Sequence, residues 1–414
     1  MKTKFLLLMI AIAIFSTQCK KGNGTGNNGG GNDNDTITKL DPVETDAANT
    51  NYPPAFSGQT RTFGIKTYTP LKVDILNSTL SNPWGIAILP DGRLLITQKA
   101  GTMVILSSSG VPEHTISGLP AVNAGGQGGL LDVALDPDFS NNRMIYWTFA
   151  QNVSGGTLTA VAKGRLANSE TSIESATVIY QAMPAYNGTL HYGGRLLFDN
   201  QGYLLVSTGE RSDLATRPLA QALNNALGKI LRITKDGQPA PGNPFQNTTG
   251  ALPEIYSYGH RNVQGMALDK LRNVLWETEF GPLGGDEVNM IQPNKNYGWP
   301  VITYGLEYSG ATIGGGITQK AGMEQPVYYW DPVVSPSGMI FYHSDYIPEW
   351  KDNLLIAALS GSHIVRLRIV NNKIAGEERL LTGQGQRFRA IAQSTNGMVY
   401  IVTDQGRLYR ITKQ

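Results

Sequence analysis

The feature that most constrains how this chain folds is a short unit, a tight turn followed by an apolar strand, that recurs along it. Three copies are visibly alike: PDGRLLITQKAGTMVIL at 90–106, NQGYLLVSTGE at 200–210 and NGMVYIVTDQGRLYRI at 396–411. Similar units lie at about 130–150, 262–279 and 337–369. The units follow one another at intervals of roughly 45 to 70 residues, a period typical of folds in which each unit packs against the next.

These repeats predict an all-β chain folded as a six-bladed β-propeller. The composition agrees, because glycine is abundant at 48 copies and only 16% of the residues are charged, as expected for many strands joined by tight turns. The main helical candidate is 218–226. The rival all-β interpretations are a sandwich and a β-helix. A strand near 71–76 would join the last repeat and close the ring, which removes an exposed sheet edge.

The N-terminal residues have the pattern of an export signal. Lys2 and Lys4 precede the apolar run FLLLMIAIAIF, which is shorter than the about 20 residues that span a bilayer. Cys19, the only cysteine, closely follows this run, where a lipoprotein signal places its acylated thiol. An ordinary cleaved signal is the alternative. We therefore expect a signal peptide over 1–19, a lipid anchor at Cys19, and export to the periplasm or the outer membrane.

Residues 20–67 begin with a stretch rich in Gly and Asn, which predicts a flexible tether, and 68–414 would form the propeller. The formal net charge of the whole chain is only +2, and Lys2 and Lys4 lie in the predicted signal. A nearly neutral protein has no electrostatic attraction to nucleic acid or to anionic lipid. We expect no nucleic-acid partner, and membrane contact only through the lipid anchor.

Two of the five histidines lie in polar, glycine-rich surroundings. His191 lies in NGTLHYGGRL (187–196), just before a predicted strand, and His260 lies in SYGHRNVQG (257–265). A histidine in such a place is either a turn residue or a general base, and a base needs a partner that fixes its tautomer. Glu210 ends the strand that follows His191 and can supply that partner.

Two further clusters carry polar side chains. The loop GPLGGDE (281–287), followed by NYGWP (296–300), offers carboxylates and backbone carbonyls, the hard oxygen ligands that Ca²⁺ takes. Arg387 and Arg389 open the last repeat, and residues i and i+2 of a strand face the same way. Two arginines that point together suit an anion with several carboxylates. A solvated surface is the alternative interpretation for both clusters.

Four motifs in this order carry a resemblance to a known family: GQGGLLDVALDPDF (126–139), HYGGRL (191–196), YGHRNVQGMA (258–267) and NYGWP (296–300). The chain resembles the soluble PQQ-dependent glucose/sorbosone dehydrogenases from about residue 82 to about residue 410. It is closest to the aldose sugar dehydrogenase branch. The resemblance implies a six-bladed β-propeller that uses PQQ and Ca²⁺ as cofactors.

The resemblance also implies roles for individual residues. His191 matches the catalytic base, and Glu210 matches the acidic residue that orients it. The positions that match the cofactor and sugar pocket are Gln127, Arg261, Asn262, Tyr308, Arg387 and Arg389. One position departs from the pattern, because Ser360 stands where many relatives have a lysine that contacts PQQ. A missing cation near a tricarboxylate would weaken cofactor binding.

The metal positions follow from the same resemblance. Gly281 and Pro282 match the backbone carbonyls that hold the catalytic Ca²⁺ against PQQ. Glu287 and the Tyr297 carbonyl match a further Ca²⁺ site. The implied reaction is the oxidation of an aldose sugar at C1 to a lactone, with an unidentified electron acceptor. No amino acid side chain accepts a hydride, so a cofactor must do so.

Two other functions remain open at this stage. A Ca²⁺-dependent lactone hydrolase also fits a six-bladed propeller, but it needs several carboxylates or amides that converge on the channel. A non-enzymatic binding propeller, tethered to the envelope, would have kept the fold and lost the cofactor, and Ser360 is the one feature in its favour.

Overall fold

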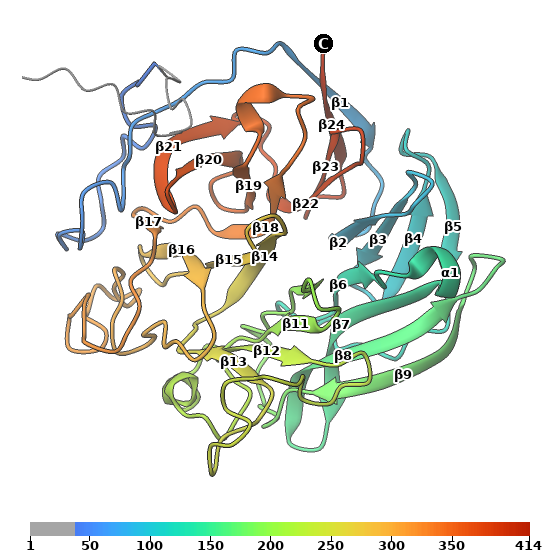
Figure 1. Ribbon diagram of the computed structural model, residues 1–414, viewed down its shortest axis with the longest axis horizontal. Helices are drawn as coiled ribbons and strands as arrows, with labels where there is room; N and C mark the ends of the chain where they lie inside the picture. Colours follow the sequence, from blue (N-terminus) through green and yellow to red (C-terminus); the bar gives the residue numbers. More distant parts are fainter. Residues whose placement is uncertain (1–37) are drawn as a thin grey trace, which may run out of the picture. The chain divides into compact units, whose positions relative to one another are not determined.

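The structure, a computed structural model, describes residues 38–414. This part of the chain contains six four-stranded antiparallel sheets, arranged as the blades of a β-propeller (Figure 1). The innermost strands β2, β6, β10, β14, β18 and β22 contact one another in a closed ring. The predicted six-bladed propeller is therefore confirmed, and each of the six sequence repeats falls in one blade.

Each blade is a meander that runs outward from the centre. Blades 1 to 3 consist of β2 Pro83–Ile88, β3 Leu94–Gln98, β4 Thr102–Leu106 and β5 Pro112–Ile116; β6 Leu130–Leu135, β7 Met144–Val153, β8 Gly156–Leu166 and β9 Ile173–Gln181; and β10 Leu196–Phe198, β11 Leu204–Ser207, β12 Lys229–Ile233 and β13 Ile255–Tyr258. Blades 4 to 6 consist of β14 Val263–Asp269, β15 Val274–Glu279, β16 Asp286–Ile291 and β17 Tyr328–Trp330; β18 Pro336–Tyr342, β19 Asn353–Ala358, β20 Ile364–Val370 and β21 Lys373–Leu380; and β22 Phe388–Gln393, β23 Val399–Thr403, β24 Leu408–Lys413 and β1 Leu71–Asn77.

Helices are short in the part of the chain that is described. They are α1 Phe139–Asn142 and the 3₁₀ helices η1 Arg217–Gln221 and η2 Pro348–Trp350. The predicted helical stretch at 218–226 therefore contains η1 and then irregular chain. None of the described helices is long and apolar enough to cross a membrane.

The hydrophobic core is divided among the interfaces between neighbouring blades. Six buried apolar clusters lie between successive blades around the ring, including the pair formed by blades 6 and 1. A middle strand such as β3 or β12 is thus buried on both faces. Burial on both faces explains why the repeats have continuous apolar runs rather than alternation, because each face removes apolar surface from water.

The ring is closed by the predicted N-terminal strand. β1 pairs antiparallel with β24, with Leu71 opposite Lys413 and Ile75 opposite Tyr409, so the blue and red strands lie side by side in Figure 1. The backbone hydrogen bonds of β24 are thereby satisfied on both sides, and the last blade is completed by the chain that precedes the first.

The described part of the expected tether, 38–67, is folded rather than free. Asn49 and Thr50 donate hydrogen bonds to the two carboxylate oxygens of Asp331 at 2.7–3.0 Å. Gly64 pairs with Glu377 at the edge of blade 5, and the Gln59 carbonyl accepts a hydrogen bond from the amide of Tyr329. These long-range contacts correct the expected tether boundary at 67, which the sequence composition could not reveal. The predicted signal, Cys19 and residues 20–37 lie outside the described residues.

Candidate active site

A cavity of about 270 Å³ lies where the loops at one end of the innermost strands converge. Its lining comes from blades 1, 4, 5 and 6 and from the segments that precede blades 2 and 3: Asn82, Pro83, Trp84, Lys99, Gly126, Gln127, Tyr192, Gly193, Gln264, Phe280, Leu359, Arg387, Arg389 and Asp404. Of the predicted pocket residues, Gln127, Arg387 and Arg389 line it, whereas Arg261 and Asn262 do not. Tyr308 is 76% exposed and does not line the cavity. Ser360 does not line it either, and its hydroxyl is hydrogen-bonded to that of Ser335 at 2.7 Å.

His191 and Glu210 form a buried pair beside this cavity. His191 Nδ1 lies 2.6 Å from Glu210 Oε1, and the His191 backbone amide donates to Gln127 Oε1 at 2.8 Å. A carboxylate only accepts hydrogen bonds, so the pair places the ring proton on Nδ1. No described residue is hydrogen-bonded to Nε2. The lone pair of that nitrogen is therefore available to a ligand.

The local sequence permits this close approach. His191 has a left-handed backbone with φ 46°, and Gly193 follows at φ 64°. A side chain at Gly209 would collide with the carbonyl oxygen of His191, and one at Gly193 would lie 2.7 Å from the Thr208 backbone. The glycines of HYGG and STGE are therefore required where the two segments meet.

The pKa of His191 is lowered to about 4, because burial disfavours the imidazolium and the nearby positive charge of Arg261 adds to that effect, whereas Glu210 opposes it. The imidazole is consequently neutral at neutral pH. A neutral imidazole with Nδ1 protonated can accept a proton at Nε2, which is the requirement for a general base.

Arg211 holds the turn that carries His191. Its guanidinium donates to the carbonyls of Leu190, Thr157 and Gly188 at 2.6–2.9 Å, and it lies 4.0 Å from the centre of the Tyr192 ring. The side chain is buried and has no carboxylate partner among the described residues. Its φ of 75° is a strained value for a residue with a side chain.

Arg261 and Asn262 lie on the next blade. Their backbone amides donate to Glu279 Oε2. The Arg261 guanidinium donates to the carbonyls of Phe280 and Gly281 at 3.1 and 2.9 Å. Arg261 Nε and Asn262 Nδ2 are buried donors without a partner among the described residues. Such orphaned donors are rare in folded proteins and suit a ligand with acceptor oxygens.

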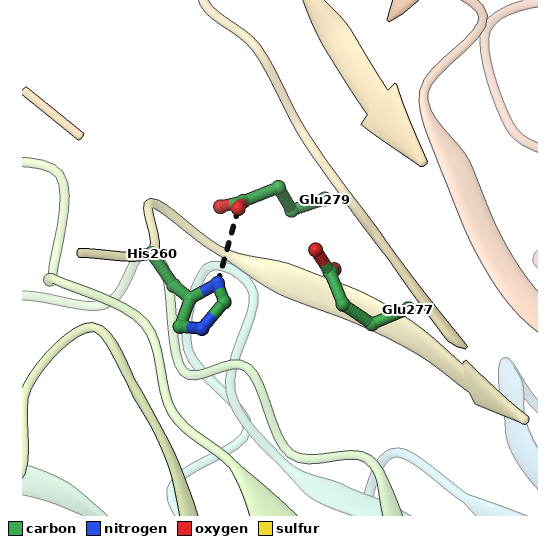
Figure 2. Close-up of side chains that lie close together, drawn as sticks. All are labelled: His260, Glu277 and Glu279. Atoms are coloured by element: carbon green, nitrogen blue, oxygen red, sulfur yellow. Dashed lines mark hydrogen bonds and ion pairs between the residues drawn. The ribbon is translucent and has the colours of Figure 1, made fainter. Parts of the chain in front are cut away.

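A group of buried acidic side chains lies on β15 and β16. Glu279 is directly opposite Glu287 in the sheet, and Glu277 is opposite Asn289. Figure 2 shows His260, Glu277 and Glu279, whose nitrogen and carboxylate oxygen atoms lie within 4.8 Å of one another. His260 Nδ1 is 3.2 Å from Glu279 Oε1. Neither Glu277 nor Glu287 has an ion-pair partner among the residues that the structure describes.

Burial and the mutual repulsion of these carboxylates raise the pKa of Glu277 and of Glu287 well above the usual value. Asn289 Nδ2 donates to both side chains, but Glu277 Oε2 and Asn289 Oδ1 are buried without a partner in the described part of the chain. A small cavity lined by Glu279, Gly281, Glu287 and Tyr297 adjoins the group. The predicted metal residues Glu287 and Tyr297 are thus brought together, with oxygen atoms left to ligate a cation.

Gly281 and Pro282, whose backbone carbonyls are predicted to bind a cation, lie in the turn after β15. The Gly281 amide donates to Asp286 Oδ1 at 2.7 Å, and the same carboxylate accepts from the amides of Val334 and Ser335. Burial raises the pKa of Asp286 to about 7. Asp286 therefore fixes the turn, while Arg261 places a positive group against the Gly281 carbonyl.

Arg387 and Arg389 both face the cavity, as the spacing along the strand predicts. Both are paired with Asp404, at 3.0 Å from Arg387 Nε and 2.8 Å from Arg389 Nε. Asp404 is not among the residues that the motifs predicted. The cavity nevertheless keeps an excess of positive charge, since Lys99, Arg387 and Arg389 face a single Asp404.

Comparisons with known proteins agree with this site. The sequence profile of the family described as "Glucose / Sorbosone dehydrogenase" matches residues 80–410. The chain belongs to this family. It is 40% identical over 347 residues to the aldose sugar dehydrogenase YliI of Escherichia coli, which covers 83% of this chain and 93% of that protein. It is an enzyme of the sugar dehydrogenase class, and the resemblance of the four motifs is confirmed.

Solved structures of related dehydrogenases have the same fold. The soluble aldose sugar dehydrogenase of E. coli in its apo form matches with a TM-score of 0.80 and 39% identity, over 83% of this chain and 100% of that one. The PQQ-bound form of the aldose sugar dehydrogenase of Streptomyces coelicolor matches with a TM-score of 0.69 and 29% identity, over 84% and 99%.

Sequence reasoning missed several residues of this dehydrogenase site. Lys99 and Asp404 occupy equivalent positions in two repeats, at the same distance after the turn glycines Gly92 and Gly397. Aligning the repeats on those glycines would have identified both as loop residues at the same end of the ring as Glu210. Arg211 and Glu277 carry no comparable signal, because a buried charge cannot be told from a solvated one in sequence.

Proposed function

We propose that this protein is a PQQ-dependent aldose sugar dehydrogenase that oxidises the C1 hydroxyl to a lactone, with His191 as the base. The observation that carries the proposal is the His191–Glu210 pair, which leaves Nε2 free beside a cavity with excess positive charge. The solved PQQ-bound relative supports the choice of cofactor.

His191 would take the proton of the sugar hydroxyl at Nε2. Because its pKa is lowered to about 4, the imidazole is unprotonated whenever the enzyme meets its substrate near neutral pH. Once the proton has transferred, the carboxylate of Glu210 at Nδ1 stabilises the imidazolium. Gln127 holds the His191 backbone in place, and Arg211 holds the turn before it, so the ring need not reorganise during the reaction.

The residues around the cavity fit a cofactor with several carboxylates. Arg387 and Arg389 would hold carboxylates. Asn262 Nδ2 and Arg261 Nε, which have no partner among the described residues, would donate to further carboxylate or quinone oxygens. When bound, PQQ supplies the hydride acceptor that the side chains lack. The exposed Tyr308 and Ser360 lie outside the cavity lining, so any contact of theirs with the cofactor would need movement of their loops.

The residues also fit two cations. The Gly281 and Pro282 carbonyls offer hard oxygen ligands beside the cavity, where the Arg261 guanidinium already marks a place for positive charge. Ca²⁺ held there would act as a Lewis acid. Glu287 and the Tyr297 carbonyl would bind the second Ca²⁺. Glu277 Oε2 and Asn289 Oδ1 are buried, have no hydrogen-bond partner within residues 38–414, and would add ligands to it.

The alternative of a lactone hydrolase fits this cavity less well. Asp404 is the one carboxylate among the described lining residues, and it is paired with two arginines. A metal-dependent hydrolase needs several carboxylates or amides at its channel. A binding propeller without activity would not require a histidine whose Nε2 is kept free and unprotonated.

Reconstitution tests the proposed activity directly. Purified apo-protein is mixed with PQQ and Ca²⁺, and a panel of aldoses is assayed with an artificial electron-accepting dye. We expect dye reduction that requires PQQ, Ca²⁺ and an aldose together, with a lactone as product. PQQ binding without oxidation of any aldose would contradict the dehydrogenase proposal, and lactone cleavage instead would favour the hydrolase.

We further propose that the protein is exported and anchored through an acylated Cys19, in the periplasm or the outer membrane, and that its electron acceptor is another molecule of that compartment. The proposal depends on the single cysteine that closely follows the apolar run. Cys19→Ser should move the protein from the membrane fraction to the soluble fraction and leave its specific activity unchanged. A wild-type protein that is soluble and unacylated would contradict it.

A further inference from the structure

Among the described residues that line the cavity, Lys99 is the cation without a carboxylate partner. Four charged side chains line the cavity, and two of the three cations, Arg387 and Arg389, share the carboxylate of Asp404. The Lys99 ammonium has no carboxylate partner among the described residues. Its one hydrogen bond within the described chain runs from Nζ to the Gly126 carbonyl at 2.5 Å. A cation that faces a cavity and is satisfied only by a neutral carbonyl can still attract an anion.

The backbone holds Lys99 at this position from both sides. Its amide donates to the Asn82 carbonyl and its carbonyl accepts from the Leu130 amide, each at 3.0 Å. Asn82 precedes β2 and Leu130 begins β6, so Lys99 is fixed between the first strands of blades 1 and 2. Gly126 belongs to the same loop as Gln127, whose side chain accepts from the His191 amide. Lys99 is thus connected to the turn that carries the base.

The repeat places Lys99 next to the arginine pair. It follows the second strand of blade 1, and Asp404 follows the second strand of blade 6. These two blades are neighbours, because β2 contacts β22. On the other side of blade 6, the equivalent loop of blade 5 carries Ser360, whose hydroxyl is taken up by Ser335. The positive charge beside the arginine pair therefore comes from blade 1 and not from blade 5.

We propose that the Lys99 ammonium binds a carboxylate of the ligand in this cavity, alongside Arg387 and Arg389. This deepens the proposed function and rests on it, because an aldose carries no charge and the cation must serve the polycarboxylate cofactor. Lys99 then supplies the positive charge that position 360 does not. On binding, Nζ exchanges or shares its contact with the Gly126 carbonyl, and no bond other than hydrogen bonds is made or broken.

Direct binding of PQQ to purified apo-protein tests the role of Lys99. Titration calorimetry at low and high salt gives Kd for wild type, Lys99→Met, Lys99→Arg and the matched control Lys351→Met. Lys351 is a surface lysine paired with Asp345, away from the cavity. We expect Lys99→Met to weaken binding about fivefold, the size expected for a partly exposed charge pair, and to reduce the dependence of Kd on salt. Lys99→Arg and Lys351→Met should bind as wild type does.

The outcomes separate the two proposals. Benzene-1,3,5-tricarboxylate serves as a second, simpler probe, so that the anion site is tested without PQQ chemistry. If wild type binds PQQ and Lys99→Met binds it equally well with the same salt dependence, the role of Lys99 is overturned and the proposed function stands. If wild type binds neither probe, both proposals fail. Equal melting temperatures of the variants would show that a weaker Kd does not come from misfolding.

Discussion

Two neighbouring blades of this propeller carry the same histidine–glutamate pair, and the two pairs differ in what surrounds the second ring nitrogen. His191 and Glu210 are 19 residues apart, as are His260 and Glu279, and in both pairs Nδ1 contacts Oε1. The surroundings of the other ring nitrogen differ. His260 Nε2 is hydrogen-bonded to Ser257 Oγ at 2.8 Å, whereas His191 Nε2 has no partner in the described part of the chain.

The second difference is what each glutamate does. Glu210 contacts His191 Nδ1 and, within the described chain, accepts one further hydrogen bond, from the Ser212 amide at 3.2 Å. Glu279 also holds the backbone amides of Arg261 and Asn262 and belongs to the buried acidic group. The His260 ring is completely buried and stacks on Tyr297 at 4.8 Å. The repeat therefore supplied one geometry twice, and the neighbouring side chains left the second ring nitrogen open in the proposed base and occupied in the other pair.

Replacing the two histidines in parallel gives the largest expected contrast. His191→Gln should lower kcat by about 10²- to 10⁴-fold, the usual contribution of a positioned general base, without loss of PQQ or Ca²⁺ binding. His260→Gln should keep kcat within about tenfold but lower the free energy of unfolding by about 1–3 kcal/mol, because it leaves buried partners unsatisfied. Single-turnover rates and denaturant melts measure both. More than a tenth of wild-type turnover in His191→Gln would contradict its role.

The acidic group on the His260 side should make stability depend on Ca²⁺. The pKa values of Glu277 and Glu287 are raised in the folded protein. Without a cation, the contribution of these side chains to the free energy of unfolding is therefore present below the ordinary glutamate pKa and is lost as pH rises above it. At a Ca²⁺ concentration of 100 times its Kd, Ca²⁺ binding would raise the free energy of unfolding by about 2.7 kcal/mol. Thermal unfolding with Ca²⁺ or a chelator, at pH 5 and pH 8, measures this. Glu277→Gln should be less sensitive to pH and to the chelator, and an equal response would exclude Glu277 as a ligand.

Replacing the glutamate of each pair should give a smaller contrast in kcat than replacing the two histidines. Glu210→Gln keeps the base but loses the charge that fixes its tautomer, so kcat should fall by about 10- to 100-fold, as when the partner that orients a functional histidine is removed. Glu279→Gln should mainly weaken PQQ binding, because it loosens the Arg261–Asn262 backbone. A larger fall in kcat for Glu279→Gln than for Glu210→Gln would reverse the assignment of the two pairs.

Arg211 extends the comparison, because none of the described residues holds the turn of His260 as the Arg211 guanidinium holds that of His191. The wild-type kcat/KM should rise with pH along a limb centred near pH 4, the pKa of His191. Arg211 lowers that pKa, so Arg211→Met should move the limb to higher pH by less than about one unit. Arg211→Lys keeps the charge and loses the forked hydrogen bonds, so the limb should stay while kcat falls. An unmoved limb in Arg211→Met would show that Arg211 positions the turn without tuning the base.

Much of the fold was accessible from sequence, because it depends on local patterns. The turn glycines and the apolar runs predicted six blades, and the position of 71–76 predicted the closing strand β1. The motifs also predicted the pairing of His191 with Glu210. These features repeat at fixed spacing, so the short-range constraints of turns and strands are enough to define them.

The tertiary structure alone decided which features of the site are free and which are already satisfied. Asp404 is paired with both arginines, and Ser257 Oγ is hydrogen-bonded to His260 Nε2. The segment from Leu40 to Gly64 contacts blade 4 through Tyr329 and blade 5 through Glu377. Each of these depends on which side chains meet across loops or blades and on how far water is excluded there. Composition and spacing carry no record of such contacts. The sequence by itself determined the repeated scaffold and its candidate groups, and burial and pairing in three dimensions determined which groups can react.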